Sequence, residues 1–78
     1  MDLRKLENRI VIDEKVMVGK PIIRGFRITV EHLLNQLASG ISYEQILQSH
    51  PELEVEDIYA CLHYASNLMN AEKVYKVA

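Results

Sequence analysis

From residue 29 onward, hydrophobic positions recur with the period of an α-helix. Counting from Val30, apolar residues fall at i+3, i+4, i+7, i+8 and i+11 and form one continuous face: Leu33, Leu34, Leu37, Ala38 and Ile41. Thr29 is a good N-cap, and Gly40 suits the position just after a helix end. The pattern therefore predicts a helix that begins after Thr29 and ends before Gly40.

Two more helices follow. Ser42 and Gln45 have the spacing of a capping box, so a short second helix should start at once. Its buried side would contain Tyr43, Ile46 and Leu47. Pro51 disfavours helical backbone at the preceding residue and should end this helix.

The third predicted helix starts near Val55 and runs to about Ala71 or beyond, because no glycine or proline occurs after Pro51. Its apolar stripe would comprise Val55, Ile58, Leu62, Ala65 and Met69. We expect Leu62 to be the most costly residue to truncate, by roughly 2–5 kcal/mol if it is buried.

Before residue 29 the pattern is extended. Residues 9–12 read as a strand, and residues 16–18 as a second short strand, with a turn at residues 13–15. Residues 1–8 fit either a helical turn or irregular chain, and residues 74–78 alternate like a strand over too short a length to assign. The fold class expected is a mainly α, trihelical domain with an N-terminal β-strand or β-hairpin.

The segment between these halves, residues 19–30, reads GKPIIRGFRITV. Its backbone is shaped by three residues with special conformational preferences: Gly19, Pro21 and Gly25. Its charge comes from three cations: Lys20, Arg24 and Arg27. The segment therefore predicts a short, stiff, positively charged loop that leads directly into the first long helix.

Composition and length indicate one domain at residues 1–78, with a basic segment at 1–28 and a helical core and tail at 29–78. Of the 78 residues, 49% are hydrophobic and 26% are charged, which is typical of a globular chain. A domain this small often gains stability by oligomerising, so we expect a homodimer. No run approaches the roughly 18 apolar residues of a membrane span. The single Cys61 and the absence of a signal-peptide pattern favour a cytoplasmic location.

Charge is divided unevenly along the chain. Residues 1–27 hold seven basic and four acidic residues, whereas residues 28–78 hold two basic and seven acidic residues. No lysine or arginine lies between Ile28 and Glu72. A partner that recognises positive charge would therefore bind the N-terminal third.

Candidate chemistry is sparse. The three histidines, His32, His50 and His63, fall on three separate segments. Cys61 has no neighbouring base and lies near the buried face of the third helix. These residues are more typical of packed or surface side chains than of a metal or catalytic site. We expect no catalytic residues, no metal and no cofactor.

The motifs GKPIIRGFRITVEHLL and LASGISYEQILQSHPELEVEDIYACLHYAS resemble those of the bacterial DUF433 family, a family of unknown function. The similarity runs from about Arg9 to Ser66. The chain departs from the usual pattern at Val18, where glycine is common, at Phe26, where threonine is common, and at His50, where tyrosine is common. The resemblance implies a homeodomain-like helix-turn-helix fold and a VapB-type antitoxin role, often beside a PIN-like nuclease toxin.

Three functions remain open at this point. The first is a non-catalytic antitoxin-like protein that binds a PIN-like toxin from an adjacent gene through Lys20, Arg24 and Arg27. The second is a transcriptional regulator that reads operator DNA with the third helix. Its outward face would hold Glu56, Tyr59, Ala60, His63, Ser66 and Asn67, with Tyr59, His63 and Asn67 as the recognition residues. That face lacks lysine and arginine, which disfavours contact with phosphates. The third is a structural dimerisation module.

Overall fold

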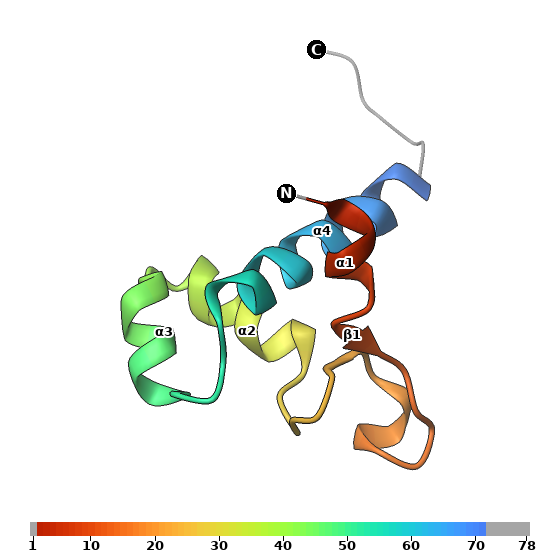
Figure 1. The fold of residues 1–78 in the computed structure, drawn as a ribbon, viewed down its shortest axis with the longest axis horizontal. Coiled ribbons are helices and arrows are strands. Elements are labelled where there is room, and N and C mark those ends of the chain that lie inside the picture. Colours follow the sequence, from red (N-terminus) through yellow and green to blue (C-terminus); the bar gives the residue numbers. More distant parts are fainter. Residues whose placement is uncertain (1, 72–78) are drawn as a thin grey trace.

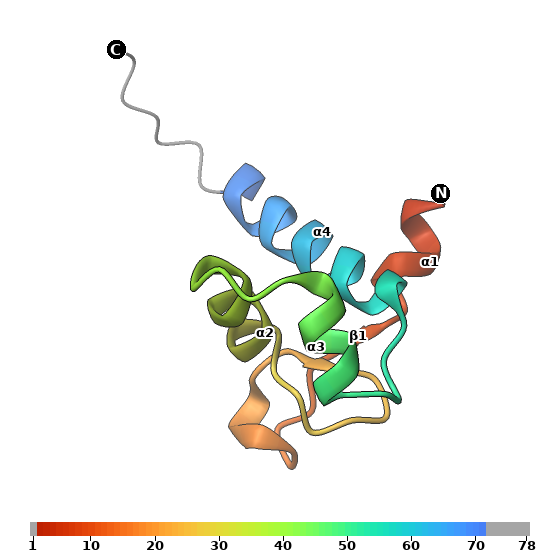
Figure 2. The ribbon, with the colours of Figure 1, turned by 90° about the vertical axis from the view of Figure 1, so that its left-hand side faces the viewer.

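Helix α4, Val55–Ala71, is the longest element, and the other helices pack against it (Figures 1 and 2). The structure, a computed structural model, describes residues 2–71. Its elements in chain order are α1 (Leu3–Glu7), β1 (Ile10–Val11), η1 (Met17–Gly19), β2 (Ile22–Ile23), α2 (Val30–Ala38), α3 (Tyr43–Ser49) and α4 (Val55–Ala71). The protein is thus a small, mainly helical domain with a two-stranded antiparallel sheet. The strand-like alternation at residues 74–78 lies outside the described residues.

The helix boundaries predicted from capping residues are confirmed. Thr29 Oγ1 accepts a hydrogen bond from the His32 N–H at 3.0 Å and begins α2, and Gly40 has φ 91° just beyond its end. Ser42 and Gln45 bond reciprocally before α3, through a 3.2 Å and a 2.9 Å hydrogen bond. Each boundary depends on residues within four positions of one another, which is why the local pattern predicts it.

Residues 2–8, which fitted two interpretations, contain a helical turn. The Asp2 side chain caps α1 by accepting from the Arg4 N–H at 3.0 Å. Leu6 is only 4% exposed, because α1 lies against α4 (Figure 1). One buried leucine thus fixes a helix that is too short to be stable alone.

The predicted strand at residues 16–18 is wrong. The partner of β1 is β2, with Ile10 opposite Ile23 and Val11 opposite Ile22. Residues 17–19 instead form a left-handed turn, and Val18 is 93% exposed. Ile22 and Ile23 are both buried, so pairing β1 with them places apolar surface in the core, which pairing with residues 16–18 would not do.

The core is aliphatic and contains residues from β2 and from all three longer helices. Its fully or nearly fully buried members are Ile23, Val30, Leu33, Ile46, Leu53, Ile58 and Cys61. Between Asp2 and Ala71, no helix is both long and apolar enough to cross a membrane.

The predicted face of α4 is wrong by about one residue. Leu62 is 39% exposed, whereas Ala60 and Cys61 are buried at 1% and 0% exposure. Helix α1 and strand β1 lie on the side that the pattern assigned to solvent, and they cover Ala60. The expectation that Leu62 is buried therefore fails, and Ile58 replaces it as the central residue of α4.

Truncation of Ile58 should be far more costly than truncation of Leu62. Ile58 has no exposed surface, so Ile58→Ala leaves a cavity and should lower the free energy of unfolding by about 2–5 kcal/mol. Leu62→Ala removes a side chain that is already partly in water and should cost about 1 kcal/mol or less. Urea denaturation of both variants measures the difference, and a larger loss for Leu62→Ala would contradict this account of α4.

Candidate functional site

Residues 19–30, which we call the basic loop, contain a tight turn that carries Arg24 and Arg27. The Phe26 N–H donates to the Ile23 carbonyl at 3.0 Å, and the Ile23 N–H donates to the Ile28 carbonyl at 3.0 Å. Gly25 has φ 82°, and no neighbouring atom would meet a Cβ there. Gly25 occupies the third position of this turn, where the positive φ favours glycine. Gly25 is therefore present because of the turn's geometry and not because of close packing.

The turn is fixed at both of its ends. The Arg24 N–H donates to the Arg9 carbonyl at 2.8 Å, which ties the loop to the residue before β1. On the other side, the Val30 N–H donates to the Pro21 carbonyl at 3.0 Å and ties the loop to α2. Gly19, with φ 76°, closes the preceding turn. The stiffness predicted from the glycines and the proline thus has a basis in backbone hydrogen bonds.

The three predicted cations of the loop have different surroundings. Lys20 Nζ lies 3.7 Å from Glu31 Oε1, in a pair exposed enough to contribute little to stability. Arg24 and Arg27 are exposed, and neither forms an ion pair with another residue in the range 2–71. Their guanidinium groups are available for bidentate bonds to an external carboxylate or phosphate.

Arg27 lines two hollows. One, of about 310 Å³, is also lined by Val11, Asp13, Val16, Ile22, Arg24, Gly25 and Phe26. The other, of about 420 Å³, is also lined by Met17, Lys20, Ile28, Thr29, Glu31, His32, Asn35 and His50. Because Arg27 lines both, the two hollows adjoin and form one surface in which the cations lie beside apolar and polar side chains. We call this surface, with Lys20, Arg24 and Arg27 as its cations, the basic loop surface.

Arg9 is basic in the sequence but points inward and supports the loop. Its Nη1 lies 2.9 Å from Asp57 Oδ1 and 3.5 Å from Glu54 Oε1. Asp57 Oδ2 also accepts from the Glu54 N–H at 2.8 Å, at the start of α4. The hydrogen bond to Asp57 raises the pKa of Arg9 above its ordinary value, which shows that this contact favours the charged guanidinium. Sequence reasoning missed this role, because Arg9 and Asp57 are 48 residues apart.

Comparisons with known proteins identify the family of this chain. A family model described as a protein of unknown function, DUF433, matches residues 10–65. The chain belongs to the DUF433 family. A crystal structure of a DUF433 member from Anabaena variabilis matches with a TM-score of 0.76 and 30% identity, over 88% of this chain and 68% of that one. No curated protein sequence matches the chain at a significant level.

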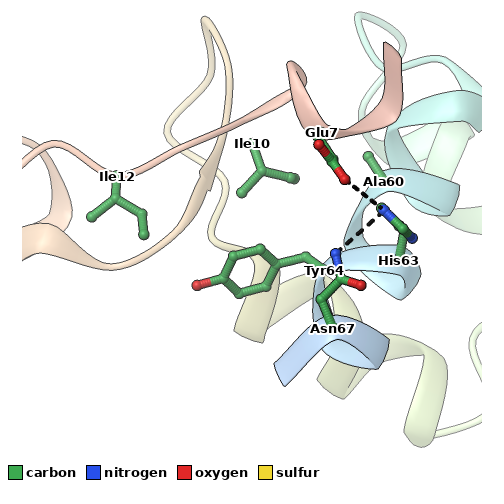
Figure 3. Close-up of a pocket in the computed structure, with 7 residues that line it drawn as sticks. All are labelled: Glu7, Ile10, Ile12, Ala60, His63, Tyr64 and Asn67. Carbon is green, nitrogen blue, oxygen red and sulfur yellow. Dashed lines mark hydrogen bonds and ion pairs between the residues drawn. The ribbon is translucent and has the colours of Figure 1, made fainter. Parts of the chain in front are cut away.

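In this DUF433 chain, two of the three proposed recognition residues of α4, Tyr59 and His63, contact other helices, and Asn67 bonds to His63 within α4. His63 Nε2 lies 3.3 Å from Glu7 Oε1 of α1 and 3.3 Å from the Asn67 amide nitrogen, as Figure 3 shows. They line a hollow of about 140 Å³ that also includes Ile10, Ile12, Ala60 and Tyr64. Tyr59 meets the Tyr43 ring edge-on, with centroids 6.2 Å apart. Tyr59 and His63 thus contact α3 and α1 respectively, and α4 does not present them on one bare face.

Cys61 is the packed thiol that the sequence favoured. It has no exposed surface, and burial, with a smaller effect from the Asp57 charge, raises its pKa to about 12. A thiol with that pKa stays protonated at neutral pH and is a poor nucleophile. Among residues 2–71, no three His, Cys, Asp or Glu side chains gather where they could hold a metal ion.

Removal of the Arg9 charge should destabilise the fold. Asp57 is only 6% exposed, so Arg9→Met leaves a buried carboxylate without its partner and should lower the free energy of unfolding by about 3 kcal/mol. Urea denaturation measures this loss.

The double variant Arg9→Met with Asp57→Asn is the matched control. Asparagine keeps an oxygen for the Glu54 N–H but carries no charge, so the double variant should recover part of the lost stability. A single variant within about 0.5 kcal/mol of the wild type, or a double variant with no recovery, would show that the ion pair does not hold the loop to α4.

Proposed function

We propose that this chain is a non-catalytic, antitoxin-like protein of a type II toxin–antitoxin system. In this proposal the basic loop surface binds and neutralises a PIN-like nuclease partner encoded by an adjacent gene. The partner's carboxylates are the groups recognised. The family resemblance suggests the partner class, and the loop geometry supports the way in which it would be bound.

One observation carries the proposal: Arg24 and Arg27 flank the glycine of a hydrogen-bonded turn and form no ion pair within the described residues. A rigid loop loses less conformational entropy on binding than a mobile one, so more of its interaction energy becomes affinity. Arginine also matches the geometry of a carboxylate with two parallel hydrogen bonds. Two arginines on a rigid turn are better suited to binding an acidic site than to keeping the protein in solution.

The chemistry of such a partner explains how binding would inhibit it. A PIN-like nuclease holds Mg²⁺ with clustered carboxylates. An arginine inserted among these carboxylates competes with the metal for the same oxygens. Inhibition would then need no catalytic group in this chain.

DNA binding is the second candidate function. A short helix, α3, followed by a longer helix, α4, supports a homeodomain-like helix-turn-helix proposal. However, residues 28–71 contain no lysine or arginine. Glu52 and Glu54 just before α4 and Glu56 in its first turn would repel phosphates. Autoregulation of the operon would therefore use the basic loop surface, with weak and strongly salt-dependent binding.

We also propose a homodimer, and the C-terminal half of α4 supports it. Leu68 and Met69 are 54% and 62% exposed. A largely apolar hollow of about 430 Å³ between α2 and α4 is lined by Pro21, Val30, Glu31, Leu34, Asn35, Tyr64, Ala65 and Leu68. A second copy of the chain would cover this surface and add to the small core of one domain.

Sedimentation equilibrium at micromolar concentration should give the mass of a dimer for the wild type. Leu68→Asp places a charge in the shared apolar surface and should shift the protein to a monomer. Leu3→Asp, at an exposed apolar residue on α1, is the control and should remain dimeric. A monomeric wild type would remove both the homodimer and the alternative of a structural dimerisation module.

The double variant Arg24→Glu and Arg27→Glu should abolish partner binding and leave the melting temperature unchanged. Loss of one side of a desolvated charge pair costs about 2–5 kcal/mol, or at least roughly 30-fold in Kd. Both side chains are exposed, so the fold does not need them. Binding is measured by co-purification and titration with the neighbouring gene product, and stability by thermal unfolding.

The control for charge is the double variant Arg4→Glu and Lys5→Glu. It changes the net charge by the same amount at exposed residues on α1, so it should bind the partner like the wild type. Equal loss in both double variants would indicate a general charge effect, and unchanged binding in the loop variant would reject the loop as the site. A lost melting transition in the loop variant would also reject it, because the arginines would then hold the fold.

A further inference from the structure

The segment before the basic loop has a backbone that its side chains do not favour. Met17, Val18 and Gly19 have φ values of 52°, 57° and 76°, so three successive residues are left-handed. Glycine adopts this conformation without strain, but a β-branched side chain such as valine rarely does. The turn is held by its own backbone, through bonds from the Gly19 N–H to the Val16 carbonyl at 3.3 Å and from the Lys20 N–H to the Met17 carbonyl at 3.2 Å.

Val18 contributes nothing to the core that would offset this strain. Its side chain is 93% exposed, the most of any large apolar residue in the range 2–71. Both ribbon views place η1 at the end of the molecule opposite the end of α4 (Figures 1 and 2). Val18 is therefore an apolar group on a strained turn that projects into solvent.

The neighbours of Val18 connect it to the basic loop surface. Met17, which is 40% exposed, lines the hollow that also contains Lys20 and Arg27. Met17 thus brings the turn that carries Val18 next to the cations Lys20 and Arg27. Strain held at an exposed position is a feature of contact sites, since the surrounding fold must stabilise a conformation that the residue itself disfavours.

We propose that Val18, supported by Met17, is an apolar anchor for the same partner that Arg24 and Arg27 recognise. This inference rests on the proposed function and adds a specificity element to it. The partner would be an acidic protein whose carboxylates border a small apolar recess that accepts the valine methyl groups. Binding to an anionic membrane usually needs a cluster of about four to eight basic residues. The basic loop surface has three cations, and Lys20 is paired with Glu31, so two arginines in fixed positions fit a few protein carboxylates better.

The test replaces Val18 with asparagine, which tolerates the left-handed conformation but has no apolar surface to bury. Relief of strain should raise the melting temperature by about 4 °C. Loss of a buried valine contact should weaken binding of the neighbouring gene product about tenfold, measured by titration calorimetry. A change that stabilises the fold and weakens the complex cannot be explained by damage to the structure.

Two further variants make the result specific. Val18→Gly should also weaken binding, with a smaller rise in melting temperature, because glycine adds entropy to the unfolded chain. Leu3→Asn, at an apolar residue that is 54% exposed on α1, should leave binding unchanged.

The outcomes separate this inference from the proposed function. Unchanged binding by Val18→Asn, with binding lost in the Arg24→Glu and Arg27→Glu variant, overturns the anchor and leaves the proposed function intact. No binding by the wild type overturns both. A lower melting temperature for Val18→Asn shows that the valine serves folding and overturns the anchor. Binding of the wild type to phosphatidylserine vesicles that Val18→Asn abolishes also overturns it, in favour of a membrane contact.

Discussion

The ion pair between Arg9 and Asp57 links the residue before β1 to the first turn of α4, in addition to the packing of α1 and β1 against that helix. The Arg9 side chain holds the first turn of α4, and the Arg9 carbonyl accepts the N–H of Arg24 in the basic loop. Asp57 in turn accepts the N–H of Glu54 before the helix. One residue thus contacts both the loop and the longest helix. The short β1–β2 pair is marginal by itself, so the ion pair and the core contact of Ile23 with the helices add to it.

The basic residues of the N-terminal third differ in their surroundings and therefore in the charge that they offer to a partner. Arg9 is partly buried and paired with Asp57, Lys20 lies beside Glu31, and Arg24 and Arg27 are exposed on a fixed turn. The charge available to a partner is therefore smaller than the sequence count suggests, but it is held in a defined place. For recognition of a carboxylate, a fixed position contributes more than extra mobile charge, because less entropy is lost on binding.

Local features of the fold were predictable from sequence, and long-range features were not. The caps at Thr29, Ser42 and Gly40 follow from side chains within a few residues, and so does the glycine turn of the basic loop. The face of α4 was misassigned because α1, which covers Ala60, begins more than 50 residues earlier. The strand partner of β1 and the inward role of Arg9 depend likewise on residues that only the folded chain brings together.

At the positions with positive φ, the conformation that the backbone needs can be compared with the one that the side chain prefers. At Gly25 and Gly40 the backbone needs positive φ, no other group lies within 4 Å of the position that a Cβ would occupy, and glycine meets the need without strain. At Val18 the backbone has the same need, and the side chain present opposes it. Folding alone would favour glycine at all three positions. The valine adds exposed apolar surface beside Met17, which lines the hollow of Lys20 and Arg27. Removing that apolar surface from water is favourable, and this happens only when a second molecule covers it.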